Sequence, residues 1–362
     1  MSFVDQIRPL LADTRVPPAH ALAAFTELLE LEGKLSWHDT AQAMRLLVGA
    51  TPTEEDRLAF LRELAPERAT GEMLAAAAAV LRELAPGIPF SAKVVFDCCG
   101  TGGDRLGLFN FSTLAALVVA AAGVPVAKHG NRAITSGCGS ADILTALGVR
   151  IEETPEQVAE LLNKNRIAFL FAPLFHTATK NVQPLRLKLR EEGVATLFNL
   201  LGPVTNPARP THQLVGVFDD RHRRPLAEAF SLLGCRRTWI VSGWAGEGVW
   251  MDEVSPCGPT RVTELADGDL RERVFDPSEV GMEPPPLAAL KGGDAATNAA
   301  LAREVLSGKS SPISEAVALN AGVALFVAEA TETPREGLAR ARALLKSGAA
   351  SEVLDRWVKM TK

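Results

Sequence analysis

The sequence predicts an α/β protein: a small helical domain plus a larger α/β domain with a mostly parallel central sheet and flanking helices. Three observations support this fold class. The chain has 362 residues, 47% of them hydrophobic, which is enough for two packed domains. Its first 89 residues have apolar side chains at helical spacing. From residue 90 onward, short apolar runs alternate with glycine-rich loops and helical patterns, as in β-α-β units.

Residues 1–89 are predicted to form the helical domain, and residues 90–362 the α/β domain. Ser36 with Asp39 and Thr53 with Asp56 are cap-like pairs, each followed by apolar residues at helical spacing. A proline–glycine pair shortly before residue 90 marks the end of this segment.

Composition argues against several classes of protein. The net charge is −5, with both signs interspersed, so non-specific binding to nucleic acid is not favoured. The five cysteines are odd in number and show no CxxC spacing, which indicates a reduced, cytoplasmic protein. The densest early apolar run, residues 73–81, is too short to span a membrane. We expect neither a signal peptide nor a membrane partner.

A β-α-β unit begins the α/β domain. Residues 94–96 are predicted to form a short buried strand that ends at a glycine-rich loop. Ser112 or Thr113 is expected to cap a helix that reaches Ala122, and residues 124–127 to form the next strand. The polar loops of such a unit meet at the carboxyl ends of parallel strands, where open α/β sheets bind ligands.

The residue types in these loops suit an anionic ligand. Glycines let backbone N–H groups approach a phosphate, and Lys128 supplies a positive charge. A single glycine-rich loop is a weak signal, but several in one unit are harder to explain as turns. The candidates for binding a phosphorylated ligand are Gly100, Gly103, Asp104, Asn110, Ser112, Thr113, Lys128, Ser136 and Ser140.

Later segments extend the α/β pattern. Strands are predicted at 167–171, 213–218 and 239–242, with a helix at about 225–233. Residues 243–248 are expected to be a flexible connection to the adjacent acids Asp252 and Glu253. Such acids are either solvated surface charges or, beside a phosphate site, ligands for magnesium. The sequence Gly292-Gly293-Asp294 is interpreted as a helix cap rather than another phosphate loop.

Short motifs rich in glycine, polar and charged residues follow one another over most of the chain. They are Gly100-Thr101-Gly102-Gly103-Asp104, Asn110-Phe111-Ser112-Thr113, Lys128-His129-Gly130-Asn131-Arg132, Gly139-Ser140-Ala141-Asp142, Phe171-Ala172-Pro173 with His176, Pro184 with Arg186, Phe198-Asn199-Leu200-Leu201-Gly202-Pro203, Thr205-Asn206-Pro207, Asp252-Glu253 and Gly258-Pro259-Thr260-Arg261-Val262. In this order the motifs resemble those of the anthranilate phosphoribosyltransferase family, within a superfamily that includes pyrimidine nucleoside phosphorylases.

The resemblance implies transfer of a phosphoribosyl group from 5-phosphoribosyl diphosphate to the amino group of anthranilate, in tryptophan biosynthesis. It implies two Mg²⁺ ions, with Ser112 on one and Asp252 with Glu253 on the other. Lys128, Asp252 and Glu253 would serve catalysis. The residues implied to bind anthranilate are Gly100, Asn131, His176 and Arg186. A homodimer, and a return of the helices near residues 172–190 to the helical domain, follow from the same resemblance.

The chain departs from the family pattern in the same loops. Leu108 stands in place of a common threonine, Arg105 in place of a small residue, and Gly137-Cys138 in place of a Lys-Ser pair. Ala195 replaces a usual arginine. Two alternatives therefore stay open: a pyrimidine nucleoside phosphorylase-like enzyme, and a non-enzymatic paralogue that binds nucleic acid. The adjacent acids argue against the first, and the acidic net charge against the second.

Overall fold

The computed structural model describes residues 18–133 and 137–362 and confirms the α/β fold class. The chain divides into two compact units. The described part of the α/β unit comprises residues 87–133, 137–175, 206–223 and 234–362, and that of the helical unit comprises residues 18–86, His176–Thr205 and Arg224–Leu233. Residues 191–205 and the segment Arg224–Leu233 were both expected in the α/β domain. The second of these packs instead against the start of a helix in the helical unit, where a Cβ on Gly71 would lie 2.4 Å from Glu228 Cβ.

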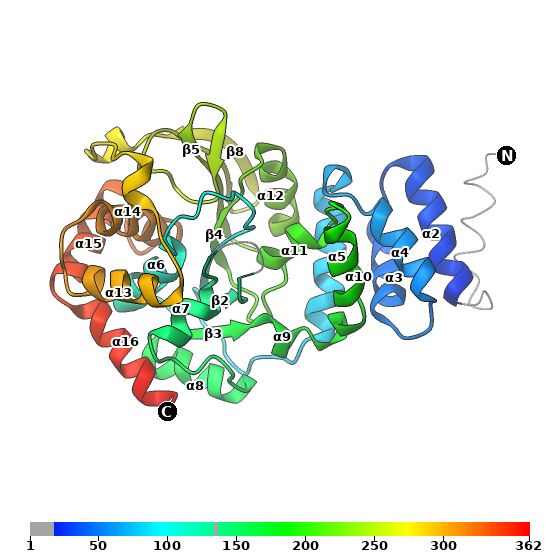
Figure 1. Ribbon diagram of the computed structural model, residues 1–362, viewed down its shortest axis with the longest axis horizontal. Helices are drawn as coiled ribbons and strands as arrows, with labels where there is room; N and C mark the ends of the chain where they lie inside the picture. Colours follow the sequence, from blue (N-terminus) through cyan, green and yellow to red (C-terminus); the bar gives the residue numbers. More distant parts are fainter. Residues whose placement is uncertain (1–17, 134–136) are drawn as a thin grey trace. The chain divides into compact units, whose positions relative to one another are not determined.

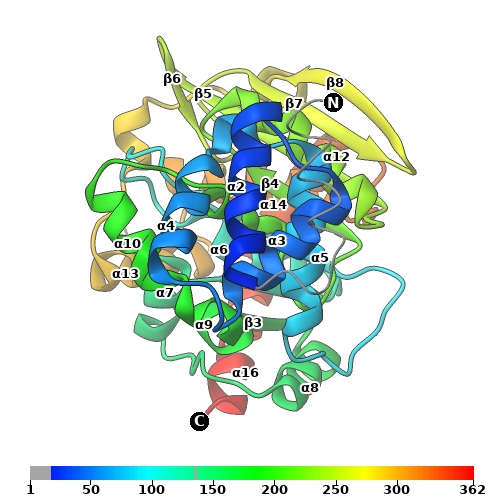
Figure 2. The ribbon, with the colours of Figure 1, turned by 90° about the vertical axis from the view of Figure 1, so that its right-hand side faces the viewer.

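In the helical unit, α2, α3 and α4 lie side by side (Figure 2). Both predicted caps are confirmed, because Ser36 accepts a hydrogen bond from the backbone of Asp39 and Thr53 from that of Asp56. The helices of the unit are α2 (Pro18–Glu32), α3 (Trp37–Val48), α4 (Glu54–Glu63), α5 (Gly71–Leu84), α10 (Gln183–Glu191), α11 (Phe198–Val204) and most of α12 (Arg223–Leu232), with 3-10 turns η1 (Pro66–Arg68) and η2 (Thr177–Asn181).

A mixed sheet forms the centre of the α/β unit, with the strand order β3-β2-β1-β4-β5-β7-β8 and with β6 paired to β5. The first five strands in this order are parallel, and the pairs that β5 forms with β6 and β7, and β7 with β8, are antiparallel. The strands are β1 (Phe96–Gly100), β2 (Val126–Gly130), β3 (Ile167–Phe171), β4 (His212–Gly216), β5 (Arg237–Gly246), β6 (Val249–Met251), β7 (Thr260–Ala266) and β8 (Asp269–Phe275).

Two apolar helices, α6 and α14, pack together and against the sheet, and α15 and α16 contact them (Figure 1). The β1 and β2 side chains join these helices in the hydrophobic core. The helices of this unit are α6 (Phe111–Ala121), α7 (Ser140–Ala146), α8 (Pro155–Asn165), α9 (Ala172–Phe175), α13 (Ala295–Leu306), α14 (Pro312–Val327), α15 (Pro334–Lys346) and α16 (Ala349–Met360), with 3-10 turns η3 (Asp220–His222), η4 (Pro277–Val280) and η5 (Leu287–Leu290).

The predicted element positions needed three corrections. The strands β1 and β2 run on to Gly100 and Gly130, so Lys128 lies within a strand rather than in a loop. Helix α6 has Asn110 at its N-cap position, and no side chain caps it there, so neither Ser112 nor Thr113 is the cap. The expected flexible connection at 243–248 is the tip of the β5–β6 hairpin. The cap at Asp294 is confirmed, since its side chain accepts from the backbone of Thr297.

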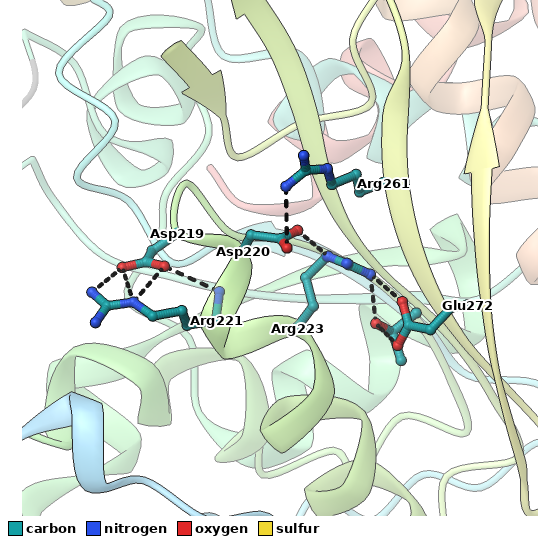
Figure 3. A network of polar contacts seen from close by, with 7 residues as sticks. Asp219, Asp220, Arg221, Arg223, Arg261 and Glu272 are labelled. Atoms are coloured by element: carbon teal, nitrogen blue, oxygen red, sulfur yellow. Dashed lines mark hydrogen bonds and ion pairs between the residues drawn. The ribbon is translucent and has the colours of Figure 1, made fainter. Parts of the chain in front are cut away.

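An ion-pair network fixes the start of α12 to β7 and β8 within the α/β unit (Figure 3). Arg223 lies between two carboxylates, with Nε 2.6 Å from Asp220 Oδ1 and Nη1 2.6 Å from Glu272 Oε2. The same Nη1 donates to Thr263 Oγ1, and Arg261 contacts the other oxygen of Asp220. These carboxylates are therefore engaged by arginines.

Among residues 18–133 and 137–362, no helix is long and apolar enough to cross a membrane.

Candidate functional site

The connections of the sheet reverse direction at β1. From β1 the chain proceeds to β2 and β3 on one side, and then returns to β4 on the other side. In the β1–β4 register, Gly100 pairs with Gly216 at the carboxyl ends of the two strands. Open α/β sheets bind ligands at such a switch point, so this is where a site is expected.

Asp252 and Glu253 lie directly on three glycines at this edge. The β5–β6 hairpin brings the two acids back over the strand ends. A Cβ on Gly100 would lie 2.1 Å from Asp252 Oδ2, one on Gly216 1.6 Å from the Asp252 carbonyl oxygen, and one on Gly243 2.4 Å from that of Glu253. Only glycine leaves room for the acids here. The sequence predicts contact of Gly100 with ligands; in the structure, the absence of a side chain at Gly100 also makes space for Asp252.

Backbone donors hold the two carboxylates. The Gly102 N–H donates to Asp252 Oδ2 at 2.7 Å, and the Ser112 N–H donates to Glu253 Oε1 at 3.2 Å. Burial, followed by the charge of Asp104, raises the pKa of Asp252 to about 7. Burial, followed by the charge of Asp252, raises the pKa of Glu253 to about 8. The structure therefore gathers three acids whose mutual repulsion a cation would relieve.

The donor set fits Mg²⁺. Among the described residues, no three His, Cys, Asp or Glu side chains are arranged to hold a metal ion on their own. Mg²⁺ is usually held by one or two carboxylates together with waters and substrate phosphates. The Asp252–Glu253 pair, with the Ser112 hydroxyl at the start of α6, supplies hard oxygen atoms of this kind.

Lys128 is buried beneath this cluster, with 2% of its surface exposed. Its Nζ donates to the Cys98 carbonyl at 2.6 Å and lies 3.4 Å from Ser112 Oγ. Its charge favours the ionised forms of both Glu253 and Asp97. Burial nevertheless raises the pKa of Asp97 to about 6. Lys128 thus offsets the negative charge of both Glu253 and Asp97.

The other residues predicted to bind phosphate have varied surroundings. Gly103 has a φ of +97° and lies against Phe218, and Thr113 is buried within α6. Both ends of the Asn110 amide are engaged, because Nδ2 donates to the Cys138 carbonyl and Oδ1 accepts from Asn298. Ser140 donates to a backbone carbonyl just after β2. Ser136 lies outside the described residues.

The departures from the family pattern have local explanations in two places. Leu108 packs against the hydrophobic core and forms a bridge with Lys291, so an apolar side chain is accommodated there. Arg105 has a φ of 56°, in the left-handed region that favours glycine. A residue other than glycine is therefore strained at this position.

Of the residues implied to bind anthranilate, His176 and Arg186 lie in the helical unit, and Asn131 lies in the α/β unit. The guanidinium of Arg186 stacks on Phe198 at 4.9 Å, and Nη1 donates to Gln183. Its Nε is buried and has no hydrogen-bond partner among the described residues. Burial and then the charge of Arg190 lower the pKa of Arg186 to about 10. A half-buried cation whose buried Nε has no partner among the described residues favours an anionic ligand.

The His176 environment predicts a pH effect on stability. Burial, followed by the charge of Arg82, lowers the pKa of His176 from 6.5 to about 4. The folded protein thus keeps His176 neutral while the unfolded chain takes up a proton. The contribution of neutral His176 to the free energy of unfolding is fully present above pH 6.5 and is lost as the pH falls towards 4. His176→Gln should therefore remove a slope of up to about 1.4 kcal/mol per pH unit in this window.

Urea unfolding of the wild type and of His176→Gln at pH 7, 6 and 5 measures how the free energy of unfolding changes with pH. His38→Gln, at an exposed position in α3, is the matched control and should keep the wild-type pH dependence. Equal slopes for His176→Gln and the wild type would contradict the prediction.

Three residues of the cluster were missed by sequence reasoning. Asp97 is fully buried and accepts from Asn206 Nδ2 at 2.8 Å and from the His129 N–H at 3.3 Å. The others are Gly216 and Gly243. An acid in an apolar strand, a glycine at the end of β4 and a glycine within β5 are the signals that could have identified them.

Comparison with known proteins agrees with this geometry. Residues 92–351 match the family described as "Glycosyl transferase family, a/b domain". The chain is 43% identical over 341 residues to anthranilate phosphoribosyltransferase of Thioalkalivibrio sulfidiphilus, covering 94% of this chain and 98% of that protein.

Two proteins of known structure share the fold. The anthranilate phosphoribosyltransferase of Thermus thermophilus is 41% identical, with a TM-score of 0.84, over 93% of this chain and 99% of that one. The enzyme of Saccharomyces cerevisiae, solved in complex with PRPP and Mg, is 27% identical with a TM-score of 0.82, over 94% and 98% of the two chains. By sequence and by fold, the chain belongs to the anthranilate phosphoribosyltransferase family.

Proposed function

We propose that this chain transfers the phosphoribosyl group of 5-phosphoribosyl diphosphate to the amino group of anthranilate. The products are N-(5-phosphoribosyl)anthranilate and diphosphate, a step of tryptophan biosynthesis. The observation that carries the proposal is the similarity over more than nine-tenths of both chains to enzymes of this name. The Asp252–Glu253 segment lies within the matched region, at the switch point of the sheet.

The residues at the switch point suit departure of a diphosphate. Asp252, Glu253 and Ser112 would hold Mg²⁺, which neutralises charge on the leaving group. Backbone N–H groups of the loop from Gly100 to Asp104 would donate to the phosphate oxygens. No strong general base is required, because an aromatic amine is nucleophilic once it is oriented. Two ions, rather than one, are part of this proposal.

The acceptor is assigned through its carboxylate. Arg186 offers a half-buried guanidinium on an aromatic face, and its buried Nε has no partner among the described residues. A carboxylate would complete its hydrogen bonding in fork geometry. Asn131 and His176 would contribute further contacts to anthranilate. A homodimer and a cytoplasmic location belong to the same proposal, and light scattering in solution tests the dimer.

An assay with purified protein tests the function. The amount of anthranilate consumed, followed by its fluorescence, should equal the amount of diphosphate released. Both should require 5-phosphoribosyl diphosphate and Mg²⁺. A panel of other aromatic amines measures acceptor choice. Phosphate-dependent cleavage of uridine or thymidine, without reaction of anthranilate, would favour the nucleoside phosphorylase alternative.

Replacing Lys128 with methionine tests the charge balance beneath the cluster. Lys128→Met keeps an unbranched side chain of nearly the same length but removes the ammonium group. An anionic substrate then faces carboxylates whose charge is no longer offset. The dissociation constant for 5-phosphoribosyl diphosphate should rise about tenfold or more, and that for anthranilate much less. Calorimetry measures both constants. Lys164→Met, which removes an exposed lysine paired with Glu160, is the control, and equal losses for both ligands would place the role of Lys128 elsewhere.

A further inference from the structure

The segment that follows β2 is tied to the first turn of α7 by two hydrogen bonds to one carbonyl group. The Asn131 carbonyl oxygen accepts from Ser140 Oγ at 3.3 Å and from the Ala141 N–H at 3.2 Å. Gly139 packs against the same segment, since a Cβ there would lie 2.4 Å from the Ala133 nitrogen. The first turn of α7 therefore holds the backbone at Asn131 in place.

Asp142 closes this arrangement. Its Oδ2 accepts from the Ala133 N–H at 2.8 Å and from the Gly139 N–H at 2.9 Å, and its Oδ1 lies 3.3 Å from Arg132 Nη1. Burial would raise the pKa of Asp142, but the bonds from Ala133 and Gly139 and the Arg132 charge outweigh it and hold the pKa below its usual range. A single ionised carboxylate thus joins two backbone segments six residues apart.

The bond from Gly139 alone would be an ordinary helix cap. Asp142 is at the third position of α7, where an acid commonly accepts from the N-cap backbone. The bond from Ala133 goes beyond a cap, because Ala133 lies outside the helix, just after β2. Arg132 adds to it, with its guanidinium 5.7 Å from the Phe171 ring centre.

This arrangement orients the Asn131 side chain. Asn131 Oδ1 accepts from the Arg132 N–H at 2.8 Å, and the residue is otherwise exposed. With its oxygen used internally, the side chain offers its Nδ2 hydrogens to a ligand, and a carboxylate accepts such hydrogens. We propose that Asp142 is a positioning residue that fixes Asn131 as a hydrogen-bond donor to the acceptor substrate. The inference rests on the proposed function.

Two substitutions of Asp142 separate this role from simple capping. Asp142→Asn keeps one oxygen that can accept from both Ala133 and Gly139, so its Michaelis constant for anthranilate should stay within about threefold of the wild type. Asp142→Ala loses both bonds, and its constant should rise about tenfold or more, while turnover at saturating anthranilate changes much less. Asp276→Ala removes a comparable capping carboxylate from η4 and should leave the constant unchanged.

Trypsin cleavage after Arg132 gives a readout that does not depend on catalysis. Mass spectrometry should find this bond cut faster in Asp142→Ala than in the wild type, Asp142→Asn or Asp276→Ala. Unchanged anthranilate kinetics in Asp142→Ala, or equal cleavage in all four proteins, would overturn the proposal. A wild-type protein that does not react with anthranilate would overturn the proposed function and the role of Asn131 in binding the acceptor substrate. The trypsin cleavage pattern would then decide whether Asp142 holds the segment that follows β2.

Discussion

Asp252→Asn combined with Glu253→Gln is expected to lower turnover about a thousandfold at saturating substrates. The neutral amides keep the shape of the two side chains but remove the charges that would bind Mg²⁺. A metal ion that stabilises a leaving group contributes several kcal/mol, and each 1.36 kcal/mol changes a rate tenfold. Steady-state assays over a range of Mg²⁺ concentrations measure the loss.

The double variant should remain folded. Burial raises the pKa of both carboxyls, so the folded protein binds protons there more tightly than the unfolded chain does. As the pH rises above the pKa values that these carboxyls have in the unfolded chain, their ionisation therefore reduces the stability of the folded protein. Neutral amides do not have this effect. The thermal unfolding midpoint of the metal-free variant at pH 8 should equal or exceed that of the wild type.

Asp219→Asn with Asp220→Asn is the matched control, because it neutralises another pair of adjacent acids in the same unit. These two acids pair with arginines, Asp219 with Arg221 and Asp220 with Arg223 (Figure 3). The control should lose thermal stability and keep turnover near that of the wild type. Turnover near wild type in the Asp252–Glu253 variant at limiting Mg²⁺ would refute the metal assignment.

Arg186→Ala should raise the Michaelis constant for anthranilate by about one to two powers of ten. A charge-assisted pair between a guanidinium and a carboxylate is worth roughly 1.5–3 kcal/mol. Arg186 is prepared for such a partner, because it is stacked on Phe198 and its buried Nε has no partner among the described residues. The constant for 5-phosphoribosyl diphosphate should hardly change, since the residues proposed to bind it belong to the α/β unit.

Two variants of the same helix sharpen this result. Arg186→Lys should recover little affinity, because an ammonium group cannot form two parallel bonds to a carboxylate. Arg190→Ala removes an exposed positive charge one turn further along α10 and should leave anthranilate kinetics nearly unchanged. If Arg186→Ala also leaves them unchanged, either the carboxylate is bound elsewhere or anthranilate is not the acceptor. Phosphoribosyl transfer as a reaction class would survive that outcome.

Local sequence patterns were sufficient to predict an element where interactions between neighbouring residues determine the backbone conformation. The cap-like pairs that begin α3 and α4 and the apolar run of β3 predicted these features at their observed positions, because both effects act within a few residues. The start of α6 could not be predicted in this way. The Ser112 N–H donates to Glu253, which lies 141 residues away in the sequence, so the residue that looks like a cap instead contacts a distant acid.

The sequence alone determined the fold class, the family resemblance and the candidate residues of the strand-end loops, because spacing and residue type express short-range preferences directly. Only the tertiary structure decided how those residues act together. It placed Lys128 in a buried strand under the acids, used Gly100, Gly216 and Gly243 to make room for Asp252 and Glu253, and engaged both ends of Asn110 within the chain. These outcomes depend on which strands become neighbours, and a pairing between residues more than a hundred positions apart has no local signature.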